Sequence, residues 1–220
     1  MVIQRSNRIR KADMVKLPKA YLSYSAWYSW NKNKNQFRKR YYENEPSYET
    51  RETIFGKKIA EMLEQKKDDP ILSKIPRGKK SEFEIKTVIR GIPVLGYLDS
   101  FTKKTGSIFE NKTGRIPWDQ KRVDDHDQLP FYAMCVKEKF GYYDPYVLLS
   151  WLETMLVERR ETIGGIDFTN DDERDKEIRL TGRIAVFTRE IYDADIEKIT
   201  ESFVKTAKEI EEDYRGWVSK

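Results

Sequence analysis

The spacing of apolar residues along the chain predicts helices towards both ends and strands in the middle. Apolar side chains recur every three or four residues over 26–42, 50–66 and 193–214, which is the period of an amphipathic helix. We expect the first helix to begin after Ser23 or Ser25, whose hydroxyls suit an N-cap, and to break in the Asn–Lys alternation at 31–35.

The central part of the chain is rich in β-branched and aromatic residues bounded by turn signals. Residues 68–80 predict a loop, 83–101 predict two strands joined by a turn at Gly91–Pro93, and 108–113 predict a third strand after a turn at 102–107. Further elements are expected in this order: a helix over 128–140 between Asp127 and Gly141, a strand within 145–158, an acidic loop at 164–175 and a strand at 177–191.

This alternation of helices and strands predicts one α/β domain with a mixed sheet over residues 1–220. Residues 1–20 are basic and lack a clear period, so we expect an N-terminal arm or lead-in. The net charge of +5 hides an asymmetry, because residues 1–40 carry +10 and the remainder −5. A basic N-terminal segment followed by an acidic remainder indicates an anionic partner, with nucleic acid as the first candidate. The alternative is that the basic terminus is solvated and binds nothing.

Composition excludes several classes of protein and of site. No apolar run is long enough to span a bilayer, and the N-terminus lacks the apolar segment of a secretory signal, so we expect a cytoplasmic protein without a membrane partner. The single cysteine, Cys135, excludes an internal disulfide and an iron–sulfur cluster held by one chain. His126 is the one histidine and is expected to lie in a turn. A metal ion would therefore be held mainly by oxygen ligands, which indicates Mg²⁺ or Mn²⁺.

The turn at 102–107 brings acidic residues together. If residues 103–106 form the loop, Asp99 lies opposite Glu110 on the neighbouring strand. Two facing carboxylates repel each other, whereas Lys112 projects from the same face as Glu110 and would compensate together with a divalent cation. Such a face can bind a metal ion and lower the pKa of its water, although an exposed ladder of acids and bases is the alternative.

Three motifs in succession sharpen this hypothesis: GYLDS at 96–100, FENKTG at 109–114 and QLPFY at 128–132. In this order they resemble the PD-(D/E)XK nuclease superfamily and, within it, the RecB-like exonucleases. LSYSAWYSW and IFGKKIAEMLE are similar to the family's opening helix and Gly-led helix, and the last strand and helix are similar to those of phage-type members. The resemblance covers roughly residues 21–215. It implies a restriction-endonuclease-like α/β core with a central mixed sheet flanked by helices, and no iron–sulfur cluster.

The resemblance also implies roles for individual residues. Asp99 and Glu110 would be metal ligands, joined by the backbone carbonyl of Asn111. Lys112 would position or polarise the attacking water and help to neutralise the phosphate. Many RecB-like nucleases carry a metal-binding histidine four residues after the glycine of the Gly-led helix, a position that is Ala60 here. Glu61 is the favoured acidic substitute, with Glu64 and a solvated helix surface as alternatives.

Gln128 and Tyr132 lie four residues apart and therefore share one helix face. Pro130 is tolerated only in the first turn of a helix, so Gln128 is expected near the helix N-terminus, where free N–H groups favour anions. In the family this face lies near the active site and the DNA, and helps to order the lysine strand. An ordinary solvated surface is the alternative.

Basic and aromatic residues around the motifs are candidate contacts with DNA. Trp27, Tyr28 and Trp30 could stack on exposed bases. Large aromatic residues on a helix face are more often core, and core is the expectation for Trp27 and Trp30. Residues 117–127 mix charges of both signs and could gate the substrate. The remaining candidates are Arg38, Lys39, Arg40, Lys57, Lys58, Arg115, Trp118, Lys121 and Arg122.

Taken with the resemblance, the sequence predicts a metal-dependent deoxyribonuclease in which water attacks a phosphodiester and leaves a 5′-phosphate. An exonuclease in DNA recombination, repair or phage DNA processing is favoured. DNA would be the main partner, and a single-strand-annealing or other recombination protein a second one. A structure-specific endonuclease is one alternative. The other is a catalytically weak DNA-binding protein that kept the fold, which Ala60 supports.

Overall fold

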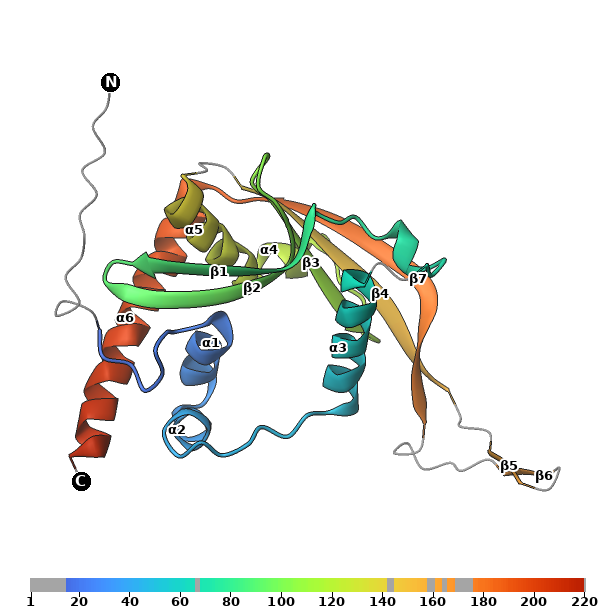
Figure 1. Ribbon diagram of the computed structural model, residues 1–220, viewed down its shortest axis with the longest axis horizontal. Coiled ribbons are helices and arrows are strands. Elements are labelled where there is room, and N and C mark those ends of the chain that lie inside the picture. Colours follow the sequence, from blue (N-terminus) through green and yellow to red (C-terminus); the bar gives the residue numbers. More distant parts are fainter. Residues whose placement is uncertain are drawn as a thin grey trace.

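The structure is a computed structural model that describes residues 15–65, 68–141, 145–157, 161–163, 166–168 and 176–219. It confirms the expected fold class, because a five-stranded mixed sheet lies among flanking helices (Figure 1). The first fourteen residues of the predicted arm fall outside the described residues. Within the described part of the chain, no helix is both long and apolar enough to cross a membrane.

The main sheet has the strand order β1-β2-β3-β4-β7. β3 and β4 run parallel and every other neighbouring pair runs antiparallel. A separate two-stranded sheet pairs β5 with β6. The strands are β1 (Lys80–Ile89), β2 (Ile92–Thr102), β3 (Ser107–Gly114), β4 (Tyr146–Val157), β5 (Glu161–Ile163), β6 (Ile166–Phe168) and β7 (Glu177–Glu190).

The helices pack on two parts of this sheet. The crossover between the parallel strands carries α5, which contacts β1, β2 and α6, whereas α3 contacts β3, β1 and β7 (Figure 1). α1 and α2 pack beside each other, and α1 also contacts α6. The helices are α1 (Tyr24–Lys32), α2 (Lys34–Tyr41), α3 (Arg51–Glu64), α4 (Gln120–Asp124), α5 (Gln128–Phe140) and α6 (Asp193–Val218), with a short 3₁₀ turn at Leu72–Lys74.

The N-terminal helices begin and break where side-chain caps act. The Ser23 hydroxyl accepts the backbone N–H of Ala26 at 3.2 Å, so Ser23 and not Ser25 caps α1. Asn33 is extended and its side chain accepts the backbone N–H of Gln36 at 3.1 Å, which caps α2. The predicted break within 31–35 is therefore confirmed, and its cause is an asparagine cap.

Three predicted connections differ from the structure. The β1–β2 turn lies at Arg90 and Gly91, whose φ angles of 46° and 84° suit a two-residue turn of type I′, and Pro93 lies inside β2. Residues 117–127 are not all loop, because Asp119 caps α4. The predicted acidic loop at 164–175 includes β6, and the rest of that loop lies outside the described residues.

The core lies around α5, which is buried along most of its length. Cys135 on α5 is fully buried, as are Phe131 and its ring partner Phe203 on α6, with centroids 5.5 Å apart. Trp27 and Trp30 are 5% and 2% exposed, so they belong to the core and are not free to stack on DNA bases. This outcome confirms the alternative that the sequence left open for both residues.

The α1–α2 pair is fastened to α6 by polar contacts. Trp30 donates its indole N–H to Glu209 Oε2 at 3.0 Å. Arg38 binds Asp213 through two hydrogen bonds of 2.9 and 2.6 Å, and this contact holds the pKa of the Asp213 carboxyl below its usual range. Arg38 was predicted to contact phosphate. Its guanidinium binds a carboxylate within the protein, and the phosphate contact stays a prediction.

The described part of the N-terminal segment also packs on the protein. Leu22 forms a parallel bridge with Val94, and the backbone N–H of Val15 donates to the Gly91 carbonyl at 3.3 Å. The side chain of Leu22 is 2% exposed. Residues 15–22 are therefore a lead-in that borders β2 and the β1–β2 turn, and not a detached arm.

Candidate active site

The β2–β3 hairpin has the predicted loop and register over its last three pairs. Thr102 pairs with Ser107 and Ser100 pairs with Phe109, but the paired residues end there. Asp99 is not paired with Glu110 as predicted. Instead, its carboxylate accepts the backbone N–H of Asn111 through Oδ2 at 2.6 Å. The carboxylate of Asp99 thereby takes the place of a ladder hydrogen bond, which fixes it against the strand that carries Glu110.

The environment of Asp99 disfavours its charged form. Burial has the largest effect and the negative charge of Glu110 the next, and together they raise the pKa of the Asp99 carboxyl well above its usual range. The N–H of Asn111 and the charge of Lys112 act in the opposite direction but do not outweigh burial. Two carboxylates thus lie close together at a site with limited access to water. A bound cation would reduce the electrostatic repulsion between them.

Glu110 has one oxygen with a partner and one without. Its side chain is 4% exposed, and Oε1 accepts a hydrogen bond from Lys112 Nζ at 2.6 Å. Among the described residues, Oε2 is buried and has no hydrogen-bond partner. Leaving a buried carboxylate oxygen unpaired is costly, so Oε2 is well suited to bind a cation.

Lys112 links the strands to α5. Its Nζ lies 2.6 Å from Glu110 Oε1 and 2.7 Å from Gln128 Oε1. Gln128 Nε2 donates to the Tyr132 hydroxyl at 2.9 Å, and His126 Nε2 lies 3.2 Å from Gln128 Oε1. The structure therefore brings the residues of the three sequence motifs together, and Gln128 and Tyr132 do share one helix face.

His126 lies in the turn between α4 and α5, as expected, but it also contacts the site. Burial, followed by the positive charge of Lys112, lowers the pKa of His126 to about 4. The ring is therefore neutral at pH 7, and the contact with Gln128 requires its Nε2–H to donate. This contribution was missed, because a lone histidine two residues before Gln128 has no distinguishing sequence pattern.

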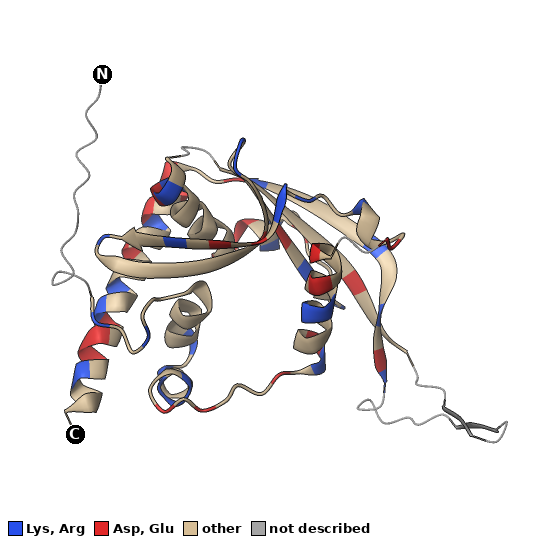
Figure 2. Cartoon of the chain, in the orientation of Figure 1, with Lys and Arg blue, Asp and Glu red and all other residues tan. Residues whose placement is uncertain are grey.

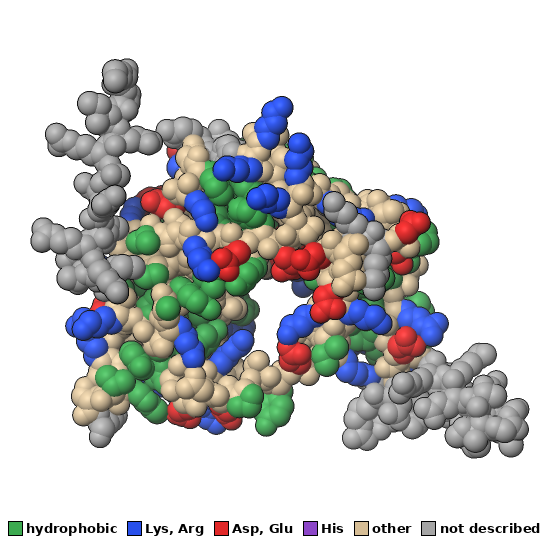
Figure 3. Space-filling view, viewed as in Figure 1, with side chains coloured by type: hydrophobic (Ala, Val, Ile, Leu, Met, Phe, Trp, Pro, Cys, Tyr) green, Lys and Arg blue, Asp and Glu red, His purple; other side chains and the backbone are tan. Residues whose placement is uncertain are grey.

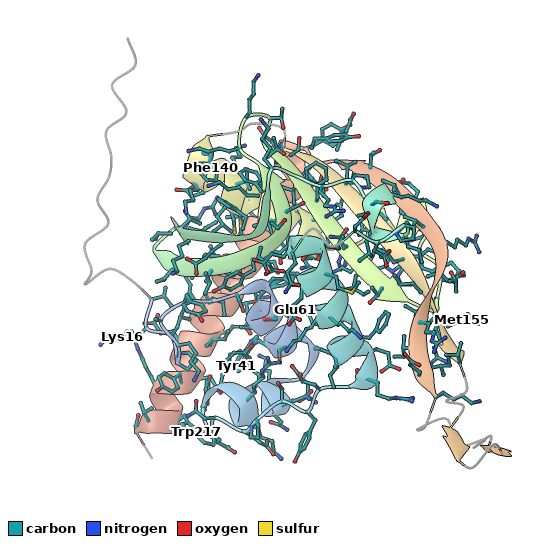
Figure 4. The ribbon with its side chains drawn as sticks, turned by 45° about the vertical axis from the view of Figure 1, so that its right-hand side comes forward. Lys16, Tyr41, Glu61, Phe140, Met155 and Trp217 are labelled. Carbon is teal, nitrogen blue, oxygen red and sulfur yellow. The ribbon has the colours of Figure 1, made fainter. Side chains whose placement is uncertain are left out.

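α3 forms the opposite wall of a cleft of about 520 Å³. Gly56 and Ala60 from this helix face Asp99, Glu110 and Lys112 across the cleft. The Ala60 methyl group supplies no ligand. Glu61, the favoured third ligand, is exposed on α3 (Figure 4). Glu64 is exposed on the same helix, and neither residue lines the cleft. The structure thus does not bring Glu61 together with the other candidate ligands.

Glu82 is a neighbour of the site that sequence reasoning missed. Its flanking residues pair with Leu98 and Ser100, which places it opposite Asp99, and its φ of 44° interrupts the ladder there. Burial, then the charges of Glu64 and Glu110, raise the pKa of its carboxyl. Placing the β1–β2 turn at Arg90–Gly91 would have given this register and identified Glu82.

Gly96 allows Tyr132 to approach the sheet. A Cβ at position 96 would lie 3.2 Å from Ile85 Cγ2 and 3.3 Å from Tyr132 Cε1.

We therefore expect Gly96→Val to lower the free energy of unfolding by about 1–3 kcal/mol and to displace the Tyr132 ring from Gln128. Urea unfolding measures the first effect. Gly114→Val is the matched control, because the nearest atom to a Cβ there is 3.9 Å away, and equal losses in both variants would contradict the prediction.

The proposed DNA contacts fall into two groups. Lys39 and Arg40 line a second cavity of about 940 Å³, and Figure 2 marks basic residues along α2. Lys57 lines the cleft and forms an ion pair with Glu49. Lys58 instead lines a groove between α3 and β7, away from this cleft.

The remaining candidates lie after β3. Arg115 is exposed directly after the end of the strand. Arg122 lies over the Trp118 ring at 4.2 Å, and that half-buried ring also meets His126 edge-on. Lys121 forms an ion pair with Asp125. The Arg122 guanidinium thus covers one face of the Trp118 ring. Arg115 is exposed and is therefore better placed than Lys121 or Arg122 to contact a phosphate.

The carboxylates of the cleft can be matched to the coordination that a metal ion requires. No three His, Cys, Asp or Glu side chains within the described ranges form a group that could hold a metal. Mg²⁺, however, commonly binds through one or two carboxylates, with waters and substrate phosphates completing its shell. Asp99 and the unpaired Oε2 of Glu110 supply such a pair, so the residues fit a magnesium or manganese ion.

The fold resembles that of a solved structure. That structure is the crystal structure of the Eubacterium rectale protein named "Putative exonuclease", with a TM-score of 0.53 and 9% sequence identity over 96% of this chain and 88% of that chain. This likeness concerns the fold and agrees with the expected nuclease-like α/β core. No protein-family model and no curated protein matches the sequence.

Proposed function

We propose that the protein is a DNA nuclease that depends on a divalent metal ion. One observation carries the proposal: the Lys112 ammonium is held between Glu110 Oε1 and Gln128 Oε1, in a cleft that also contains the half-buried Asp99. A fixed cation beside two carboxylates suits a reaction that gathers negative charge on a phosphate. The fold likeness to a protein named an exonuclease supports the same activity.

Asp99, Glu110 and the backbone carbonyl of Asn111 would hold Mg²⁺ or Mn²⁺. When bound, the ion would lower the pKa of a water molecule and stabilise charge on the phosphate oxygens. The two carboxylates provide the negative charge that retains the ion. Glu110 is buried and Asp99 is half-buried, which limits competition from water for the ligand oxygens.

Lys112 would orient the attacking water and neutralise the phosphate. Its position depends on Gln128, whose amide is oriented at both ends, since Oε1 accepts from Lys112 and Nε2 donates to Tyr132. His126, neutral at pH 7, donates to the same Oε1 and adds no competing positive charge. These contacts hold the ammonium in one place before the substrate arrives, which reduces the reorganisation needed during reaction.

We further propose an exonuclease that acts in DNA recombination, repair or phage DNA processing in the cytoplasm. A single-strand-annealing or other recombination protein would be its partner. The order of the sequence motifs supports this finer proposal. A catalytically weak DNA-binding protein is the second candidate, because Ala60 leaves the α3 wall of the cleft without a ligand.

The decisive experiment incubates the protein with end-labelled single- and double-stranded DNA in Mg²⁺, Mn²⁺ or EDTA. We expect cleavage with either metal and none with EDTA. Release of nucleotides from an end indicates an exonuclease, and internal fragments indicate an endonuclease. DNA that stays intact with both metals while still binding the protein would support the DNA-binding alternative and overturn the nuclease proposal.

A further inference from the structure

A groove of about 500 Å³ lies between α3 and the first residues of β7. Of the residues that line it, Ile59 alone also lines the catalytic cleft. The groove is largely apolar: Phe55, Ile178 and Leu180 are half-buried there, and Ile54 leaves 54% of its surface exposed. Figure 3 shows both hydrophobic and basic side chains on the surface over α3 and the neighbouring end of β7. An apolar side chain of another molecule would be removed from water in this groove.

The strand β7 contributes its free edge to the groove. β7 is the last strand of the main sheet, so no strand in the described part of the chain pairs with the edge that faces away from β4. Four successive residues of β7, Glu177–Leu180, line the groove. Successive side chains of a strand point to opposite faces, so a groove that contacts all four runs along the edge. The backbone groups on this edge can therefore pair with an added strand.

The groove carries more positive than negative charge. Its lining includes four cationic side chains and two carboxylates: Arg51, Lys58, Lys176, Arg179, Asp69 and Glu177. Both carboxylates are engaged within the protein. Glu177 forms an ion pair with Arg179 at 3.0 Å, and Asp69 Oδ1 accepts two backbone N–H groups of the following turn at 2.8 Å. The charge that remains suits a ligand with acidic residues.

An apolar groove beside a free strand edge is the arrangement used in β-strand addition. In that mode main-chain hydrogen bonds supply affinity, and pockets for alternate side chains supply specificity. We propose that this groove binds an extended acidic segment of a partner protein. The segment pairs with β7 along Glu177–Leu180, places an apolar side chain between α3 and β7, and sets carboxylates near Lys58 and Lys176. This inference goes beyond the proposed nuclease function and does not depend on it.

An extended segment fits better than a helix or a second copy of this chain. A helix satisfies its own backbone groups and would leave the edge of β7 unpaired. Antiparallel pairing of two β7 strands around Thr181 would set Arg179 of one copy opposite Arg183 of the other. Like charges directly opposite each other destabilise a sheet. The same cations favour carboxylates from a different protein.

The first test selects peptides from a random library on the immobilised full-length protein. We expect the selected peptides to be rich in aspartate and glutamate and to carry apolar residues at every second position, which is the period of a strand. A selection that yields no binding peptide, or only basic ones, would overturn the proposal.

The second test places the selected peptide in the groove. Ile54→Asp should weaken its binding by about tenfold or more, because the variant sets a carboxylate on the apolar wall. The side chain is more than half exposed, so the variant should fold normally. Ile116→Asp is the matched control, since Ile116 is 72% exposed and does not line the groove. Equal affinity of Ile54→Asp and the wild-type protein would overturn the assignment to this groove.

The charge of the groove is tested in the same way. Lys58→Glu should weaken binding of the acidic peptide by about fivefold or more, and added salt should reduce the difference. Lys74→Glu is the control, because Lys74 is exposed on the neighbouring 3₁₀ turn and does not line the groove. Equal effects of the two substitutions would contradict the role of the groove cations.

N-methylation of the selected peptide tests strand pairing. Alternate N–H groups of a strand point to opposite edges, so methylating one alternate set should weaken binding by about tenfold or more, and methylating the other set should change little. Equal losses from both sets would overturn the added strand.

Light scattering of the protein without peptide tests the second copy as the occupant. We expect a molecular mass that Ile54→Asp leaves unchanged. A dimer that dissociates in this variant would assign the groove to a second copy and overturn the partner proposal. None of these measurements contains DNA or a metal ion, so failure to bind peptides would leave the nuclease proposal intact, and failure to cleave DNA would leave this inference intact.

Discussion

Lys112→Ala should reduce the rate of DNA cleavage by about 10²- to 10⁴-fold, the range expected when a group that acts on the transition state is removed. The variant loses the cation that bridges Glu110 and Gln128, so neither the water nor the phosphate is oriented. DNA affinity should change little, because the proposed DNA contacts Lys39 and Arg40 lie in the other cavity. Single-turnover cleavage and binding in EDTA measure the two effects separately.

Two control variants test whether the loss of cleavage is specific to the charge of Lys112. Lys104→Ala removes an exposed lysine from the tip of the β2–β3 hairpin and should leave cleavage unchanged. Lys112→Gln keeps a hydrogen-bond donor near Glu110 and removes the charge, so a folded but inactive protein is expected. If Lys112→Ala cuts DNA at the normal rate, the site assignment is wrong.

Asp99→Asn should abolish metal-dependent cleavage and, in EDTA, stabilise the protein. The half-buried Asp99 carboxylate lies near the charge of Glu110 without a cation, and asparagine removes that repulsion while its oxygen can still accept the Asn111 N–H. We expect the free energy of unfolding in EDTA to rise by about 0.5–2 kcal/mol, as is common when a functional site is relieved of strain. The wild-type protein should gain stability from Mn²⁺, and the variant should gain less, because one ligand is gone.

The pH dependence of stability gives an independent check of this prediction. The pKa of Asp99 is higher in the folded protein than in the unfolded chain, so the folded state binds the proton more tightly. In EDTA its contribution to stability is full below the unfolded pKa of about 3.9 and is lost as the pH rises through the folded pKa. Asp99→Asn should remove this loss. An equal fall in stability with rising pH in both proteins, measured by urea unfolding, would contradict the prediction.

The sequence predicted those parts of the site that depend on local geometry. The register of the β2–β3 hairpin follows from the length of its loop, which fixed the pair Thr102 and Ser107. The shared face of Gln128 and Tyr132 follows from the helical period. The helix break at Asn33 follows from the capping chemistry of asparagine.

The features that escaped prediction depend on contacts between distant parts of the chain. The charge of Arg38 gave no sign that Asp213 would bind it, because the two residues lie 175 positions apart. The turn at Arg90–Gly91 requires a positive φ at an arginine, which sequence preference disfavours, so the register that places Glu82 beside Asp99 was missed. Tyr48 gave no signal in the sequence, whereas Tyr28 was a candidate for base stacking, and the fold places both beside one cavity.

The fastening of α1 and α2 to α6 has a consequence for synthesis. Glu209 and Asp213 hold α1 and α2 in place, yet the ribosome makes them after every residue that lines the catalytic cleft. Domains generally fold as units. Because α6 also supplies Phe203 to the core around α5, the cleft and the two N-terminal helices become fixed together, when the last helix emerges.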